Sequence, residues 1–120
     1  MARLSWTEDA VGIGKVCERG FAVERAGNMI PGVVWHPAAS SGPRPLVLMG
    51  HGGSGHKRNE RMVMLGRLFA GDYGWYAAAI DGPVHGGRGS VTDAGDPAYR
   101  QMWQRPEIVQ EMIEIGRAHV

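Results

Sequence analysis

Two stretches of the chain are rich in glycine and histidine and could carry chemistry. Residues 50–57 read GHGGSGHK and residues 81–89 read DGPVHGGRG, and each follows an apolar run. Glycine lets the backbone approach a ligand closely and adopt a positive φ. The backbone N–H groups of a glycine-rich turn between a strand and a helix can bind a phosphate group, or the negatively charged oxygen that forms during acyl transfer. The first stretch therefore raises two alternatives, a dinucleotide site and an oxyanion hole.

The chain before these stretches has the pattern of an antiparallel strand pair. Residues 21–27 alternate apolar and polar side chains, as a half-buried strand does. The turn pair Gly27-Asn28 leads into a second predicted strand at residues 29–37. Pro31 within that run indicates a strand start, an edge strand or a bulge.

A strand–helix–strand unit is predicted next. Residues 46–49 and 75–80 are wholly apolar, as in strands buried on both faces of a parallel sheet. Residues 57–71 carry apolar side chains at helical spacing. We therefore expect an α/β fold in which a right-handed crossover joins two neighbouring parallel strands. The first glycine-rich turn then lies at the carboxyl end of a parallel strand, where open α/β sheets bind ligands.

The dinucleotide alternative rests on residues 50–55, which match the pattern G-x-G-x-x-G, and on Asp81 at the end of the next strand. Two strands precede the unit, and Asp81 comes about ten residues later than the fingerprint places its ribose-binding acid. The pattern also leaves His51 and His85 without a role. This alternative stays open, as does a small α/β domain without enzymatic activity.

Both stretches resemble motifs of the α/β-hydrolases. HGGSG at residues 51–55 resembles the oxyanion loop after the third strand, and residues 81–89 resemble the loop after the fourth, D-x-P-G-H-G-x-S. The chain departs from the second motif, because Val84 replaces a glycine and Arg88-Gly89 precede Ser90. The resemblance covers roughly residues 20–114 and is nearest to dienelactone hydrolase-like and acyl-peptidase-like esterases.

The resemblance implies the amino-terminal part of an incomplete α/β-hydrolase sheet and a serine-type ester hydrolase in the full-length form. It implies that this loop gives one backbone N–H donor to an oxyanion, with Gly53 as the first choice and Gly52 as the second. His51, Asp81 and His85 would support the two loops, His51 as a brace and not as a base. It further implies a small-molecule ester or acyl substrate and no cofactor. The small net charge without charge blocks, and the lack of an apolar run long enough to span a bilayer, lead us to expect no nucleic-acid and no membrane partner.

The sequence offers no nucleophile. G-x-S-x-G does not occur, and no serine lies on a strand-to-helix elbow; the serines are Ser5, Ser40, Ser41, Ser54 and Ser90. Cys17 precedes the first predicted strand and is expected to be an ordinary small residue. We expect the triad serine, acid and histidine after residue 120, and no catalysis from this chain by itself. Residues 1–114 would form the amino-terminal portion of the domain.

Residues 115–120, IGRAHV, have the sequence of a translated sequencing adapter, so a non-native tail is expected; the alternative is the last turn of a carboxyl-terminal helix.

Composition excludes few other functions. The 120 residues allow one domain at most, and a net charge of +1 without charge blocks gives little support for a nucleic-acid partner. One cysteine excludes an intrachain disulfide, and a cytoplasmic location is the default expectation. A metal site is not favoured, although four residues could supply ligands: His51, His56, Asp81 and His85. Four cations are expected on the solvent-exposed face of the predicted helix: Lys57, Arg58, Arg61 and Arg67.

Overall fold

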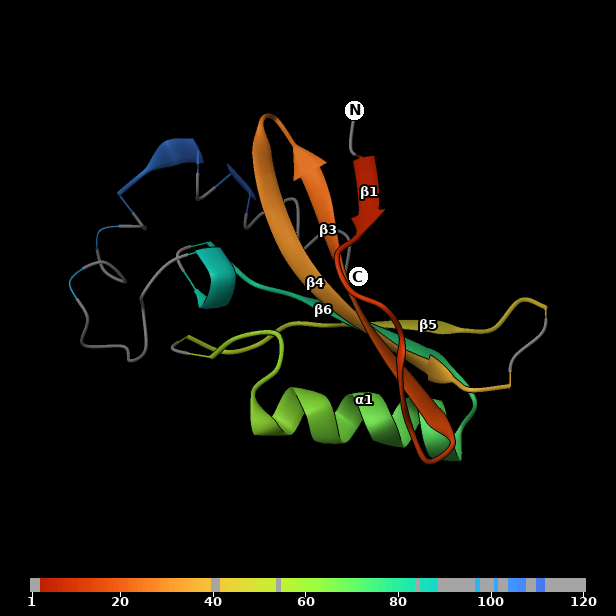
Figure 1. Ribbon diagram of the computed structural model, residues 1–120. Coiled ribbons are helices and arrows are strands. Elements are labelled where there is room, and N and C mark those ends of the chain that lie inside the picture. Colours follow the sequence, from red (N-terminus) through yellow and green to blue (C-terminus); the bar gives the residue numbers. More distant parts are fainter. Residues whose placement is uncertain are drawn as a thin grey trace.

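The computed structural model describes residues 3–39, 42–53, 55–83, 85–88, 97, 101, 104–107, 110 and 111. Figure 1 shows the long strands of a twisted sheet with helix α1 along one side. In chain order the elements are β1 (Arg3–Trp6), β2 (Val11–Ile13), β3 (Val16–Arg25), β4 (Asn28–Pro37), β5 (Leu46–Met49), α1 (Glu60–Asp72), β6 (Tyr76–Ile80) and the 3-10 turn η1 (Gly86–Arg88). The predicted tail at residues 115–120 lies outside the described residues, as do Ser54, Val84 and Ser90.

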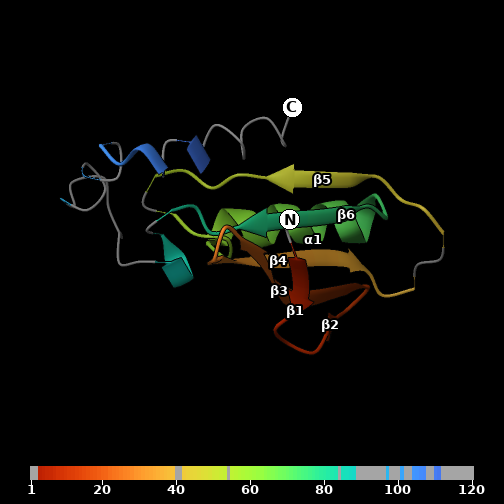
Figure 2. The same ribbon diagram turned by 90° about the horizontal axis from the view of Figure 1, so that it is seen from above.

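The strands form one sheet in the order β1-β3-β4-β6-β5, and β2 pairs with β3 outside this path. Figure 2 shows this succession from above. Strands β1, β3, β4 and β6 pair antiparallel, whereas β5 and β6 pair parallel. The predicted α/β class is therefore confirmed, and the two apolar runs are neighbouring parallel strands joined through α1.

The antiparallel part is larger than predicted. Strands β3 and β4 pair over ten residues each, from Val16 opposite Pro37 to Arg25 opposite Asn28. Ala26 and Gly27 close the hairpin with φ values of 50° and 80°, as a tight hairpin turn requires. The short strands β1 and β2 were not predicted, because three or four exposed residues carry too little pattern to show a period of two.

Pro31 lies inside β4 and so does not mark the start of the strand. Strand β4 is also not an edge strand, because it lies between β3 and β6. Its carbonyl oxygen accepts a hydrogen bond from Asp81 N–H at 2.9 Å, just past the last β4–β6 pair. A proline has no N–H to return to the Asp81 carbonyl. That carbonyl instead accepts from Arg88 Nη1 at 3.3 Å. The proline is tolerated because it lies where the β4–β6 ladder ends.

Helix α1 begins at Glu60 and not at residue 57. The Asn59 side chain accepts a hydrogen bond from Met62 N–H at 3.0 Å and so caps the first turn. The helix ends at Asp72, and Gly74, with a φ of 69°, follows it; Gly71 is still helical. Gly66 lies against the ring of Trp35 on β4. The core on this face is a single cluster: Val16, Val33, Trp35, Met49, Met62, Ala70, Ala77 and Ala79.

Strand β5 was expected to be buried on both faces, and this is wrong. Met49 is buried and Val47 packs against the core under α1. Leu46 and Leu48 point to the opposite face and are 57% and 40% exposed. Side chains alternate between the two faces of a strand, and α1 covers only one of them. The far face of the sheet has its own smaller cluster of Phe21, Val34 and Ala78.

Candidate functional site: the loops after β5 and β6

The first glycine-rich stretch forms the loop that leads from β5 to α1. Gly52 and Gly53 are exposed, and among the described residues neither backbone N–H has a hydrogen-bond acceptor. Gly55 N–H donates to Gly52 O at 3.0 Å and tightens the turn. Gly52 does not have a positive φ, and a Cβ on it would meet nothing within 4 Å. The glycine at this position is therefore required neither by the backbone nor by neighbouring atoms, and the space beside it is open.

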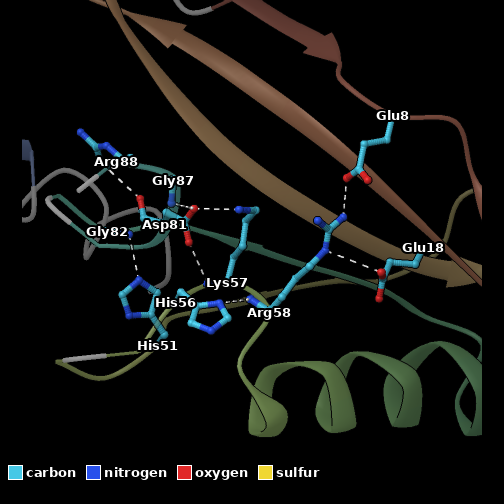
Figure 3. A network of polar contacts seen from close by, with 10 residues as sticks. All are labelled: Glu8, Glu18, His51, His56, Lys57, Arg58, Asp81, Gly82, Gly87 and Arg88. Atoms are coloured by element: carbon cyan, nitrogen blue, oxygen red, sulfur yellow. Dashed lines mark hydrogen bonds and ion pairs between the residues drawn. The ribbon is translucent and has the colours of Figure 1, made fainter. Parts of the chain in front are cut away.

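His51 joins this loop to the loop after β6. Its Nε2 accepts a hydrogen bond from Gly82 N–H at 2.8 Å, so the ring proton must be on Nδ1, which donates to Gly52 O at 2.8 Å. Burial lowers the pKa of His51, the Gly52 carbonyl opposes this, and the ring of His85 at 5.2 Å lowers the pKa further. Both ring nitrogens are occupied in the neutral form, as Figure 3 shows for the Gly82 contact.

Asp81 is the centre of the loop after β6. Its carboxylate is fully buried; Oδ1 accepts from Lys57 N–H at 2.9 Å, and Oδ2 accepts from Lys57 Nζ at 2.7 Å and Gly87 N–H at 2.9 Å (Figure 3). Burial acts to raise the pKa of Asp81, but the hydrogen bonds and charge of Lys57, with Gly87, outweigh it and lower the pKa. The carboxylate is therefore ionised, and both of its oxygens accept hydrogen bonds from the protein.

The residues that follow Asp81 fit closely around it. Gly86 has a φ of 53°, and a Cβ on it would lie 2.6 Å from Asp81 Oδ2 and closer still to Oδ1. His85 is 3% exposed, with Nδ1 placed 2.8 Å from Pro83 O. The structure thus brings together His51, Asp81 and His85 at the carboxyl ends of β5 and β6, although His51 is 30 residues from Asp81 and 34 from His85 along the chain. Their supporting role remains a prediction.

Two cations before α1 were assigned wrongly from the sequence. Lys57 and Arg58 do not lie on the solvent face of the helix, whereas Arg61 and Arg67 are exposed, as expected. Lys57 is bound to Asp81. Arg58 forms an ion pair with Glu8, and its Nε lies 3.6 Å from Glu18 Oε2 (Figure 3). The carboxylate partners are 24 or more residues away along the chain, so local spacing carried no signal for either contact.

Two further groups were missed. Glu18 Oε1 accepts the indole N–H of Trp35 at 2.6 Å, which fixes the largest buried side chain of the core. Arg88 Nη2 donates to Glu111 Oε2 at 2.8 Å, and its Nη1 also contacts this carboxylate. Glu111 is 5% exposed, so this pair ties the loop after β6 to the carboxyl-terminal region.

Within the part of the chain that the structure describes, no helix is long and apolar enough to cross a membrane.

Comparison with known proteins identifies esterases as structural relatives. No protein-family model and no curated protein matches the chain. Among solved structures, a cold-adapted esterase from an Arctic intertidal metagenomic library, in a PEG-bound complex, is 42% identical with a TM-score of 0.71; the match covers 83% of this chain and 41% of that one. The native structure of a cold-adapted esterase from such a library is 33% identical with a TM-score of 0.58, over 83% of this chain and 38% of that one.

An acetyl xylan esterase from Paenibacillus sp. R4 shares the fold, at 21% identity and a TM-score of 0.54 over 79% of this chain and 29% of that one. The chain thus spans less than half the length of each of these esterases. The resemblance to α/β-hydrolase esterases that the two motifs predicted is confirmed over most of the chain.

Proposed function

We propose that this chain is the amino-terminal part of a serine-type ester hydrolase, and that the loop between β5 and α1 supplies half of its oxyanion hole. The observation that carries the proposal is the state of Gly52 and Gly53. Both residues are exposed, and their N–H groups have no acceptor among the described residues, in a loop held on both sides at the carboxyl end of a parallel strand. The 42% identity with an esterase supports the same reaction class.

Ester hydrolysis by a serine explains the need for these donors. The serine oxygen attacks the ester carbonyl carbon, its proton passes to a histidine, and negative charge collects on the carbonyl oxygen. A backbone N–H that is already aimed at that oxygen lowers the barrier by about 3 kcal/mol. We assign the donor of this loop to Gly53 N–H, with Gly52 N–H as the second choice. The remaining donor would come from the residue after the nucleophile.

His51 is a brace for this loop and not the general base. Its Nε2 already accepts from Gly82 and its Nδ1 already donates to Gly52 O, so neither nitrogen is available to take a serine proton. Asp81 is likewise occupied by Lys57 and Gly87, which suits a loop support better than a triad acid.

The nucleophile, its acid and its histidine are proposed to lie after residue 120. Strand β5 is the last strand of the sheet order, so one of its edges has no neighbour among the described strands. Leu46 and Leu48 are exposed on the face opposite α1. A further strand and covering helices would pair this edge and bury these side chains. We further propose that the full-length protein is a dienelactone hydrolase-like esterase and that it is cytoplasmic.

No observation favours the dinucleotide alternative. Its ribose-binding acid would be Asp81, which is fully buried and bound to Lys57. Its last glycine, Gly55, would open the helix, but α1 starts only at Glu60 behind an Asn59 cap.

The decisive experiment compares the 120-residue chain with the protein extended through the downstream reading frame. We expect the extended protein alone to hydrolyse p-nitrophenyl acetate and to react with a fluorophosphonate probe, on a serine after residue 120 located by peptide mass spectrometry. The short chain should be silent and should self-associate on size-exclusion chromatography, because the β5 edge is unpaired. A probe adduct on Ser54 or another serine of this chain would refute the proposal, as would an extended protein without esterase activity.

A further inference from the structure

The loop that carries Gly52 and Gly53 is attached at two points to the loop after β6. The first attachment is the hydrogen bond between His51 and Gly82. The second is the contact between Lys57 and Asp81. The two glycines lie between these attachments in sequence. Their placement relative to the end of β6 therefore depends on both.

Lys57 makes the stronger of the two attachments. It reaches both oxygens of the Asp81 carboxylate, with its backbone N–H at 2.9 Å and its ammonium group at 2.7 Å. Asp81 has no exposed side-chain surface and the side chain of Lys57 is 16% exposed, so the ion pair is shielded from water. Gly87 N–H, which belongs to the same loop as Asp81, donates to Asp81 Oδ2 at 2.9 Å. The carboxylate thus joins the end of one loop to the start of the other.

We propose that Lys57 is a positioning residue for the oxyanion hole: its contact with Asp81 fixes where Gly52 and Gly53 lie relative to the β6 loop. The inference rests on the function proposed above and adds a residue to it. Lys57 touches neither substrate nor reacting atoms in this scheme. It acts through Asp81 and through the exit of the loop into α1.

Removal of the ammonium group leaves a buried carboxylate without its counter-charge. The side chain of Asp81 must then take up a proton or admit water, and either change weakens the attachment on the Lys57 side, where the backbone N–H of residue 57 is the donor that remains. Displacement of reacting groups by about 1 Å costs roughly 100-fold in rate. Ground-state binding of the ester does not use the oxyanion donors fully, so the loss should appear in kcat and not in KM.

The test uses Lys57→Met in the full-length protein, with Arg67→Met as the matched control. Arg67 is an exposed cation on α1 with no ion pair among the described residues, so the same change there removes a charge without touching the loop. We expect kcat for p-nitrophenyl acetate to fall about 100-fold in Lys57→Met, with KM within about twofold, and neither to change in Arg67→Met. Unchanged kcat in Lys57→Met would overturn the proposal.

A second readout does not depend on activity. In 15N-glycine-labelled protein, the backbone order parameters of Gly52 and Gly53 should be near 0.85 in the wild type and fall below about 0.6 in Lys57→Met, but not in Arg67→Met. Equal order in all three proteins would also overturn the proposal. If the wild type is ordered here but hydrolyses no ester, the proposed function fails while the role of Lys57 in loop order is still decided.

A milder variant keeps the test decisive if Lys57→Met does not fold. Lys57→Gln keeps a donor of similar length but removes the charge. We expect its kcat to be at least about fivefold lower than that of the wild type, with KM unchanged, because a neutral amide holds the buried carboxylate less firmly. Wild-type kcat and wild-type order at Gly52 and Gly53 in this variant would refute the inference.

Discussion

Gly66→Ala should destabilise the protein, although alanine is the better helix former. Gly66 is buried in α1 and faces Trp35 on β4. A Cβ on Gly66 would lie 2.8 Å from Cγ of Trp35 and closer still to Cδ2 and Cε3, whereas ordinary contact begins at 3.4 Å. The ring has little room to yield, because Trp35 is fully buried and its indole N–H is bound to Glu18 at 2.6 Å.

Two opposing terms set the magnitude of this change. Helix propensity favours alanine over glycine by about 1 kcal/mol. Forcing an additional methyl group into a packed core costs about 1–3 kcal/mol, and the clash at Gly66 involves a rigid ring, which places it at the upper end. We therefore expect a net loss of about 1–2 kcal/mol in the free energy of unfolding. Helix α1 would move away from the sheet to make room.

The assay is urea unfolding followed by circular dichroism, with Gly71→Ala as the matched control. Gly71 lies in the same helix, and a Cβ on it would meet only Val16 Cγ2, at 3.2 Å. The Gly71→Ala midpoint should be unchanged or raised, because a valine methyl group can shift by a few tenths of an ångström. The reasoning is refuted if Gly66→Ala raises the midpoint as much as Gly71→Ala does, with the same m-value.

Three further changes test the N-cap of α1 and the loops after β5 and β6. Asn59→Ala should lower the free energy of unfolding by about 1 kcal/mol through loss of the N-cap, measured by urea unfolding; no change would mean that another group caps α1. Gly86→Ala should lower the melting temperature and displace Asp81, because Gly86 has a φ of 53° and its new Cβ would lie 2.6 Å from Asp81 Oδ2; a wild-type melting curve would contradict this. The lowered pKa of His51 means that protonation favours the unfolded chain, so its contribution to stability is present above the ordinary pKa of 6.5 and is lost as the pH falls below that value. The urea midpoint should therefore fall more steeply below pH 6.5 in the wild type than in His51→Gln, and parallel curves would contradict the neutral brace.

The sequence by itself determined the fold class and the place where the two glycine-rich loops meet. The apolar runs at residues 46–49 and 75–80 flank a helical pattern, and a chain with that pattern forms neighbouring parallel strands through a crossover helix. The two glycine- and histidine-rich stretches follow those runs directly. Their meeting at one edge of the sheet was therefore predictable from the order of elements. A hairpin turn near residue 27 was also readable, since turn chemistry is local, although the turn residues are Ala26 and Gly27 and Asn28 is the first residue of β4.

Only the tertiary structure decided which partner each charged side chain meets. Lys57 and Asp81 are 24 residues apart, and Arg58 and Glu8 are 50 apart, so no local period connects them. The ends of β5 and β6 and the start of α1 place Lys57 over Asp81, and burial then makes that pairing necessary. The exposure of Leu46 and Leu48 was also a tertiary result, because a run of apolar residues shows that a strand can be buried but not which of its faces this chain covers.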